Sequence, residues 1–215
     1  MAKRREQSAV KQECDWSLEE AARQHGALRI AGLDEVGRGP LFGPVVAAAV
    51  ILPFGCSLPG LTDSKKLSEK KREHFAAGIR AAAVAWAVAE VDVEMIDRIN
   101  IRRASLEAMR RAVAQLAVPP DYLLIDGRDT IDWNGPQEAV IGGDGRSLSI
   151  AAASVLAKVH RDRLLVELDA VYPGYGLARH KGYGSAEHLE ALKQLGPTPL
   201  HRKSFQPVAQ RLLFE

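Results

Sequence analysis

Three segments of the sequence place acidic side chains beside glycine at the end of an apolar stretch. These segments read GLDE, LIDG and GGDG, and their acids are Asp34, Glu35, Asp126 and Asp144. Ligands collect at the carboxyl ends of strands in open α/β sheets, because the loops diverge there and leave backbone groups free. If the three ends are neighbours in the fold, the four acids form one carboxylate cluster.

Such a cluster has a definite chemistry. Carboxylates at close range repel one another, which raises their pKa values unless cations neutralise them. Oxygen ligands without His or Cys at a ligand spacing suit Mg²⁺ or Mn²⁺ better than zinc. The alternative is that each acid only caps a helix or a turn, which is the commoner role of a single Asp-Gly pair. Asp34 and Glu35 fit that alternative less well, since only one of two adjacent charges could cap. The spacing alone does not show that the three ends converge.

The order of the expected strands and helices predicts an α/β domain with a mixed sheet, because strands come first and then alternate with helices. These elements must position the acids. Strands are expected at 28–34, 45–52, 84–93, 121–127 and 137–145. Helices are expected at 17–27, 67–83, 101–117, 147–172 and 186–196, with 173–185 as a loop. Ser17 and Ser68 are the expected N-caps of the first two helices. The fourth helix is apolar nearly all round in its first half, which predicts burial of that half.

Bulk composition is that of a globular protein without a membrane span. The hydrophobic fraction is 47% and the charged fraction 26%, and a formal net charge of +2 is too mild to indicate nucleic-acid binding by itself. The two cysteines, Cys14 and Cys56, have no neighbour at a metal-ligand spacing and fit a reducing cytoplasm. The longest apolar stretch, 45–54, falls far short of the ~20 residues of a membrane span. We therefore expect a cytoplasmic protein.

Six segments, in order, resemble the successive motifs of type 2 ribonuclease H, the bacterial ribonuclease HII family. They are GLDEVGRGPLFGPVVAAAVIL, DSKKLSEKKR, LLIDG, SIAAASVLAKVHRDR, YGLARHKGYGS and HRKSF, and they span about residues 29–207. The resemblance implies a ribonuclease H-like fold, with a mixed central β-sheet flanked by helices and a small helical C-terminal part. Val36 and Phe42 stand where smaller residues are expected. Both are apolar, so we expect a change in packing and no loss of chemistry.

The resemblance also implies a reaction. Members of this family cut the phosphodiester 5′ of a ribonucleotide in duplex DNA or in RNA–DNA hybrids, and leave a 5′-phosphate and a 3′-hydroxyl. Asp34, Glu35, Asp126 and Asp144 match the family's four metal-binding acids, which hold two Mg²⁺ or Mn²⁺ ions. The implied role is excision of ribonucleotides from genomic DNA.

By the same resemblance, Gly37, Arg38 and Gly39 lie at the 2′-hydroxyl of the ribonucleotide, with Arg38 beside the phosphate. Glycines allow a close backbone approach, and the 2′-hydroxyl is what distinguishes RNA from DNA. Tyr183 would stack on the deoxyribose that follows. Without the resemblance, a tight turn with a solvated arginine and a loop tyrosine half packed on the core explain these residues as well.

A serine and three lysines near the predicted site resemble phosphate contacts of the family. They are Ser64, Lys65 and Lys66, just before a helix, together with Lys158 on the long helix. Without the resemblance, a short charged segment such as 64–66 is more often simply exposed to solvent. Asp162 shares the helix face of Lys158 and is expected to be structural. Four further residues contact phosphates or are simply solvated: His180, Lys181, Arg202 and Lys203.

We expect three parts in the chain. Residues 1–15 form a flexible basic arm, 16–175 a ribonuclease H-like catalytic core, and 176–215 a C-terminal loop and helical segment that completes the substrate site. The expected protein is a monomer without membrane contact, and a sliding-clamp or polymerase partner stays open. A junction-cutting DNA nuclease and a non-catalytic nucleic-acid binder are the alternatives. The Gly-Arg-Gly segment and Tyr183 argue against the first, and the full set of acids argues against the second.

Overall fold

A five-stranded mixed sheet forms the centre of the protein, which is described by a computed structural model over residues 14–212. The sheet has the order β3-β2-β1-β4-β5. The strands are β1 (Ile30–Val36), β2 (Val45–Ile51), β3 (Ala85–Val91), β4 (Tyr122–Asp126) and β5 (Gln137–Val140). β2 is antiparallel to β1 and β3, whereas β4 is parallel to β1 and β5. The predicted mixed sheet is thus confirmed. The expected basic arm, 1–15, lies almost wholly outside the described residues.

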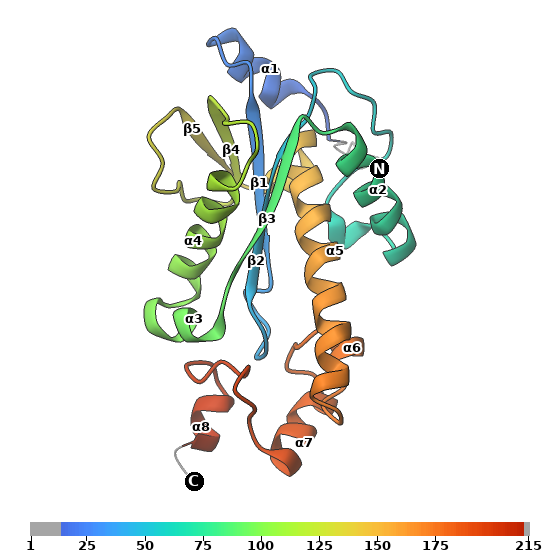
Figure 1. The fold of residues 1–215 in the computed structure, drawn as a ribbon, viewed down its shortest axis with the longest axis vertical. Coiled ribbons are helices and arrows are strands. Elements are labelled where there is room, and N and C mark those ends of the chain that lie inside the picture. The colour runs from blue at the N-terminus through green and yellow to red at the C-terminus, as the bar shows by residue number, and fades with distance from the viewer. Residues whose placement is uncertain (1–13, 213–215) are drawn as a thin grey trace, which may run out of the picture.

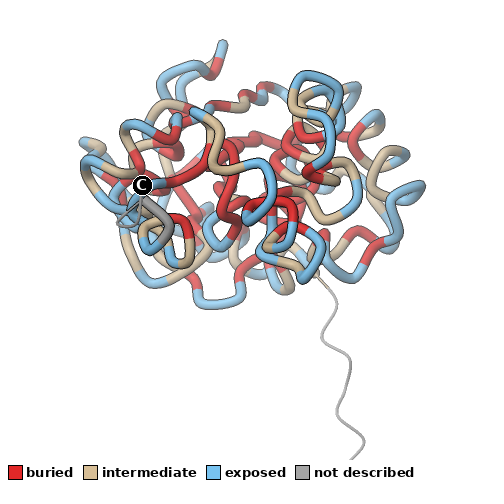
Figure 2. The backbone as a smooth tube through the Cα atoms, turned by 90° about the horizontal axis from the view of Figure 1, so that it is seen from below, coloured by how far each residue is buried: buried red, intermediate tan, exposed pale blue. Residues whose placement is uncertain are grey.

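Alternate residues of the strands supply two separate cores, one on each face of the sheet. Figure 1 shows the sheet nearly edge-on, with α3 (Val93–Ile99) and α4 (Ile101–Ala114) on one side and α2 (Glu69–Ala82) and α5 (Leu148–Val171) on the other. Leu33 and Ile125 face α4, while Val46 and Val50 face α5. Figure 2 shows the buried backbone gathered at the centre of the molecule and exposed loops around it. Two flanked faces explain why β2 is buried at all seven positions.

Small residues let α5 approach the sheet closely. Residues 47–49 of β2 are alanines, and Gly32 of β1 lies against the backbone of Ser149 at the start of α5. A Cβ on Gly32 would fall on the carbonyl carbon of Ser149. Glycine within a strand often marks such a close backbone approach. The start of α5 is therefore held directly over β1, the strand that carries Asp34.

The C-terminal part lies beyond one end of the sheet. It contains α6 (Leu177–His180), α7 (Ala186–Leu195) and α8 (Val208–Leu212), seen at the bottom of Figure 1. Phe42 joins it to the core, since its ring is fully buried and meets His201 and Tyr172 edge to face. The backbone adds three hydrogen bonds, each of 2.9 Å: Leu41 N donates to Gly182 O, Gly43 N donates to Leu200 O, and Arg202 N donates to Leu41 O. Phe42 thus packs in an apolar cluster between the core and the C-terminal part.

Helix caps confirm one expectation and correct another. Ser68 caps α2, because its hydroxyl accepts a hydrogen bond from Lys71 N at 3.4 Å. Ser17 is not a cap: it is the first residue of α1 (Ser17–Gln24), and its N–H donates to Asp15 Oδ1 at 2.9 Å. The carboxylate before the helix takes the role expected of the serine.

Three α-helices were not expected from the sequence: α3, α6 and α8. The predicted strand 84–93 ends at Val91, and α3 begins at once because the side chain of Asp92 accepts from Met95 N at 2.8 Å. The expected loop 173–185 contains α6, a single turn between two left-handed residues, Gly176 and Lys181. All three helices, α8 included, are too short for a hydrophobic period to be read. Among residues 14–212, no helix is long and apolar enough to cross a membrane.

The packing of β1 on α5 can be tested with Gly32→Ala. The new methyl group meets backbone, which cannot rotate away, so we expect a loss of about 2–3 kcal/mol in the free energy of unfolding. Urea unfolding measures this loss. Gly78→Ala in α2 is the control, since its Cβ would meet only Leu58 Cδ2, at 4.0 Å. That variant should gain up to ~1 kcal/mol from helix propensity. Equal stability of the two variants would contradict the close approach.

Candidate active site

The four predicted acids converge at one edge of the sheet. Because β1, β4 and β5 are parallel neighbours, their carboxyl ends lie together. Asp34 and Glu35 lie near the end of β1, and Asp126 is the last residue of β4. Asp144 follows β5 in the short 3₁₀ helix η2 (Gly143–Gly145). The expected neighbourhood of the three acidic segments is therefore observed. The strand was expected to end at Asp34, but β1 continues through Glu35 to Val36, so both acids lie inside it.

Asp34 is the centre of this cluster. Its side chain is buried, with 6% of the residue exposed, and its Oδ1 accepts a hydrogen bond from Glu35 N at 2.7 Å. Burial raises the pKa of Asp34 well above its ordinary value, and the charges of Glu35, Asp126 and Asp144 raise it further. A carboxylate with this environment is ionised at small cost only when a cation is near.

Asp126 and Asp144 share the second side of the cluster. Asp126 Oδ1 accepts from Gly143 N at 2.7 Å and from Asp144 N at 3.4 Å, so the end of β4 positions η2. Burial, and then Glu35, raise the pKa of Asp126, although the Gly143 N–H opposes this. Burial and the charge of Asp126 raise the pKa of Asp144 in turn. Lys65 Nζ lies 3.7 Å from Asp144 Oδ2 and offsets part of the negative charge.

Glu35 leaves one oxygen unused. Its Oε1 pairs with Arg38 Nη1 at 3.0 Å, but its Oε2 is buried and has no hydrogen-bond partner. Within residues 14–212, no three Asp, Glu, His or Cys side chains already enclose a point as a finished metal cage. The donor set nevertheless fits a hard divalent cation, since it consists of carboxylate oxygens, includes one unsatisfied atom, and raises the pKa values of three of its own members.

The predicted sugar-reading segment, residues 37–39, follows the acids of β1 directly. The packing of the protein also requires glycine within it. Gly37 has a φ of +91°, and the space of its missing Cβ is filled by Arg161 Nε. A Cβ on Gly39 would lie 3.4 Å from Tyr183 Cε1, so the tyrosine ring stands over this glycine. Tyr183 is 47% exposed and free to meet a ligand. The two predicted discriminators are thus neighbours, although Arg38 and Tyr183 are far apart in the sequence.

Ser64 and Lys158 are engaged in contacts within the protein that the sequence did not predict. Ser64 is only 4% exposed, and its hydroxyl is 2.8 Å from that of Ser154, which lies beneath Asp34. A phosphate contact through an exposed Ser64 hydroxyl is therefore not available in this structure. Lys158 Nζ donates to Asp162 Oδ1 at 2.6 Å, in agreement with the structural role expected of Asp162. The predicted phosphate contact of Lys158 stays a prediction.

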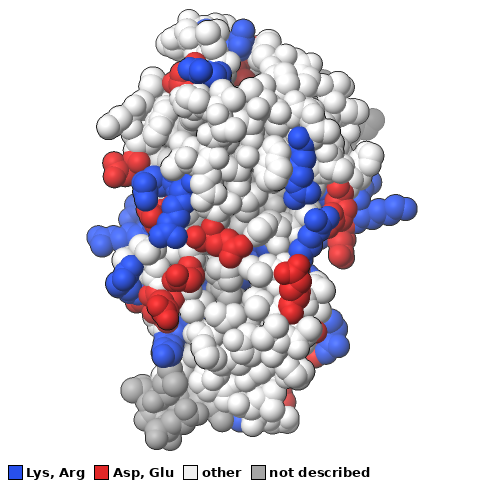
Figure 3. Space-filling view, in the orientation of Figure 1, with Lys and Arg blue, Asp and Glu red and all other residues white. Residues whose placement is uncertain are grey.

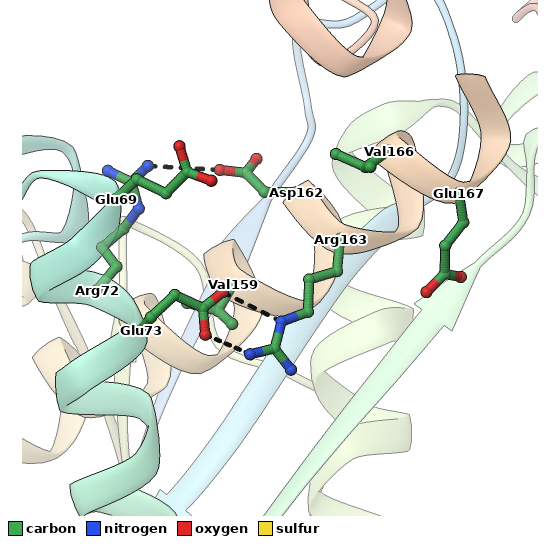
Figure 4. A pocket seen from close by; sticks show the side chains of 8 residues that line it. All are labelled: Glu69, Arg72, Glu73, Val159, Asp162, Arg163, Val166 and Glu167. Atoms are coloured by element: carbon green, nitrogen blue, oxygen red, sulfur yellow. Dashed lines mark hydrogen bonds and ion pairs between the residues drawn. The ribbon is translucent and has the colours of Figure 1, made fainter. Parts of the chain in front are cut away.

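Arg72 is a positioning residue that the sequence reasoning missed. Its guanidinium donates to Leu67 O at 2.7 Å and to Ser64 O at 3.3 Å, and it lies 3.5 Å from Asp162. Figure 4 shows this contact between α2 and α5, beside the pair formed by Arg163 and Glu73, around a cavity of about 200 Å³. Arg72 thus fastens the 3₁₀ turn η1 (Ser64–Lys66) to the long helix. No spacing in the sequence marks it, because two of its three acceptors are backbone carbonyls.

Arg38 and Lys65 pair with two of the acids, whereas Arg202 lies away from the surface. Figure 3 shows a band of acidic and basic side chains across the middle of one face, between largely uncharged surfaces. Lys65, Lys66 and Lys203 are exposed. Arg202 is fully buried, which corrects the expectation that it contacts phosphate or is solvated. His180 donates to Tyr175 O and accepts from Gly182 N, so it stabilises the turn that carries Tyr183.

The fold and the site define a ribonuclease H-like nuclease, a class that depends on divalent metal ions. The mixed five-stranded sheet carries carboxylates at the ends of its parallel strands. The family model described as Ribonuclease HII matches residues 31–208. The chain therefore belongs to the ribonuclease HII family, and it is a metal-dependent endonuclease of the ribonuclease H type.

Relatives agree in sequence and in structure. The ribonuclease HII of Geobacter metallireducens is 56% identical over 197 residues, which is 92% of this chain and 92% of that protein. The ribonuclease H2 of Pyrococcus horikoshii OT3 has a TM-score of 0.73 at 25% identity, covering 85% of this chain and 96% of the other. The RNase HII of Archaeoglobus fulgidus, solved in complex with PCNA, has a TM-score of 0.69 at 27% identity, covering 83% and 96%.

The electrostatics of the acids can be tested with Asp126→Asn. The amide keeps an oxygen that accepts from Gly143 N, while a repelling charge is removed. We expect the melting temperature of the metal-free protein to stay the same or rise by up to about 5 °C. The same variant should lose turnover. Differential scanning calorimetry in EDTA measures the stability.

Asp121→Asn is the matched control for that variant. Its carboxylate accepts from Leu28 N at 3.0 Å and Arg29 N at 2.8 Å and lies 3.6 Å from Arg29 Nε, so it is favourably paired. We expect this substitution to lower the melting temperature slightly. A fall of many degrees in Asp126→Asn would show that Asp126 is structural and would contradict the repulsion among the acids.

Proposed function

We propose that this protein hydrolyses the phosphodiester 5′ of a ribonucleotide in duplex DNA or in an RNA–DNA hybrid, and leaves a 5′-phosphate and a 3′-hydroxyl. The observation that carries the proposal is the contact between the two predicted discriminators at the acidic cluster. Tyr183 stands over Gly39, and Arg38 of the same segment pairs with Glu35. A sugar bound there would have its phosphate beside the carboxylates.

In this proposal Asp34, Glu35, Asp126 and Asp144 hold two divalent ions, Mg²⁺ or Mn²⁺. Bound there, such ions supply an activated water and stabilise the charge on the leaving oxygen. The carboxylates would confine the positive charge of the ions to the site, because Asp34 is buried and its neighbours are partly buried. The water-derived nucleophile, and not the 2′-hydroxyl, accounts for the proposed products.

Substrate binding would use the chain's exposed cations and its exposed ring. Arg38 has a half-exposed side chain, at 53%, and can leave Glu35 for a phosphate at small cost because exposed ion pairs contribute little. Lys65 and Lys66 lie on η1 beside Asp144. Tyr183 would lie against the sugar that follows the ribonucleotide, where a 2′-hydroxyl would crowd its ring. These contacts favour a junction from RNA to DNA.

The proposed biological role is excision of ribonucleotides from genomic DNA, in the cytoplasm. Both cysteines are free thiols, which accords with a reducing compartment. All four acids and both discriminators come from one chain, so a monomer suffices for the site. The Archaeoglobus fulgidus protein forms a complex with PCNA. We propose no particular clamp partner for this chain.

The reaction is tested by cleavage of a labelled DNA duplex that carries one ribonucleotide. We expect one cut, 5′ of the ribonucleotide, with Mg²⁺ or Mn²⁺ and none with EDTA. An all-DNA duplex should stay intact, and Asp34→Asn should lower kcat by at least about 10³-fold. Denaturing gels locate the cut to the nucleotide. Equal cutting of the all-DNA duplex would instead assign a general nuclease, and binding without cleavage a non-catalytic module.

The phosphate contacts are tested by the salt dependence of binding. Removing one phosphate contact with Lys66→Met should reduce the slope of log K against log salt concentration by about 0.9. Lys70→Met is the control, because Lys70 is equally exposed but lies in the first turn of α2 and was not predicted to contact phosphate. Fluorescence anisotropy across a salt series measures both slopes. Identical slopes in the two variants would remove Lys66 from the binding surface.

A further inference from the structure

Two arginines are completely buried behind the Gly-Arg-Gly segment. Arg161 on α5 and Arg202 in the C-terminal part each have 0% exposure. Among the described residues, neither makes an ion pair with a carboxylate. Burial lowers the pKa of Arg161 to about 10, and burial together with the charge of Arg161 lowers the pKa of Arg202 to about 9. Both groups remain protonated at neutral pH. A buried cation without an anion is costly unless all its donors are satisfied.

Backbone carbonyls satisfy Arg202. Its Nη2 donates to Gly37 O at 2.6 Å and to Gly43 O at 2.8 Å, its Nη1 donates to Arg38 O at 3.0 Å, and its Nε donates to Gly43 O at 3.0 Å. The planar fork of a guanidinium can reach several carbonyls at once, which the ammonium of a lysine cannot do in this geometry. Arg202 therefore determines where two successive carbonyls of the Gly-Arg-Gly segment point.

Carbonyl direction determines amide direction. In a trans peptide the C=O and the N–H point to opposite sides of the chain. Since the carbonyls of Gly37 and Arg38 point inward to Arg202, the N–H groups of Arg38 and Gly39 point away from it. Within residues 14–212, neither of these two amides donates to a protein acceptor. The segment thus presents two unused backbone donors beside Tyr183 and the acids.

Arg161 ties the tyrosine turn to the same segment. Its guanidinium donates to Phe42 O at 3.0 Å, to Pro44 O at 3.2 Å and to Lys181 O at 3.0 Å. Its side chain also occupies the space next to Gly37 that a Cβ would need. One buried arginine therefore fixes the carbonyls of the sugar-reading segment, and the other joins that segment to the turn that carries Tyr183.

We propose that Arg202 is a positioning residue for ribonucleotide specificity: it holds the Gly37–Arg38 and Arg38–Gly39 peptides with their N–H groups toward the sugar, while Arg161 holds Tyr183 in register with them. The inference rests on the proposed function, because it assumes that this segment reads a 2′-hydroxyl. It predicts that Arg202 contributes to the discrimination between ribose and deoxyribose without touching the substrate. A merely structural arginine would affect the stability of the protein and not its preference.

The test compares two affinities in the Asp126→Asn background, which prevents turnover. One duplex carries a single ribonucleotide and the other is all DNA. With Arg202→Lys we expect the ribonucleotide preference to fall about tenfold, the equivalent of one hydrogen bond, while the affinity for all DNA stays within about twofold. Fluorescence anisotropy measures both affinities, at a temperature equally far below the melting point of each variant.

Two further variants separate positioning from stability. Ile79→Ala removes a fully buried side chain of α2, in the core between α2 and α5, and should lower the melting temperature without changing the preference. Phe205→Leu removes the ring that lies 5.0 Å from the Arg202 guanidinium and should reduce the preference by about twofold to threefold, as befits a weak cation–π contact. Phe205 is only partly buried, so this variant is expected to fold.

Each outcome bears on one proposal. An unchanged preference in a folded Arg202→Lys protein overturns the positioning role. If Arg202→Lys does not fold, an unchanged preference in Phe205→Leu overturns it equally. A loss of preference in Ile79→Ala as large as that in Arg202→Lys would assign the effect to stability and overturn it as well. An absence of any ribonucleotide preference in the parent protein would instead refute the proposed function.

Discussion

Parallel pairing of β1 with β4 and of β4 with β5 is the constraint on which the site depends. It brings the carboxyl ends of three strands to one edge, so that carboxylates distant in the sequence, Asp126 and Asp144, become neighbours of Asp34. Parallel strands need crossover connections, and here α3, α4 and the loop before β5 provide them. The close fit of α5 over Gly32 holds the central strand in place. Packing therefore maintains a cluster that electrostatic repulsion opposes.

Opposite charges lie on the two sides of one short segment. The acids stand at the end of β1, and residues 37–39 follow immediately, with the guanidinium groups of Arg161 and Arg202 buried behind them. Each group is unfavourable alone, because the acids repel and the arginines have no carboxylate partner among the described residues. The carbonyls of the segment satisfy the arginines, and its exposed side faces the acids. Residues 37–39 thus lie between the acids at the edge of the sheet and the two buried arginines.

Much of the architecture was predictable from local patterns. Apolar runs identified all five strands, and the Ser68 cap and the apolar first half of the long helix were both found where expected. The misses have local causes. α3 and α6 are too short for a period, and their starts depend on Asp92 as a cap and on a left-handed Gly176. At the start of α1 both Asp15 and Ser17 could accept from the first amides, and the carboxylate prevailed.

The sequence by itself determined the candidates for the chemistry: the residue types, their order and their positions beside glycine singled out four acids, the Gly-Arg-Gly segment and Tyr183. Tertiary structure decided which of the other polar residues lie behind the candidate site and hold it in place. Ser64 is buried against Ser154, and Arg72 donates a hydrogen bond to the carbonyl of Leu67, next to η1. Arg202 donates to carbonyls of the Gly-Arg-Gly segment, 165 residues away in the sequence. The physical reason is that backbone carbonyls are the main acceptors of these arginines. Every residue carries the same carbonyl, so no residue type in the sequence marks which one an arginine will find.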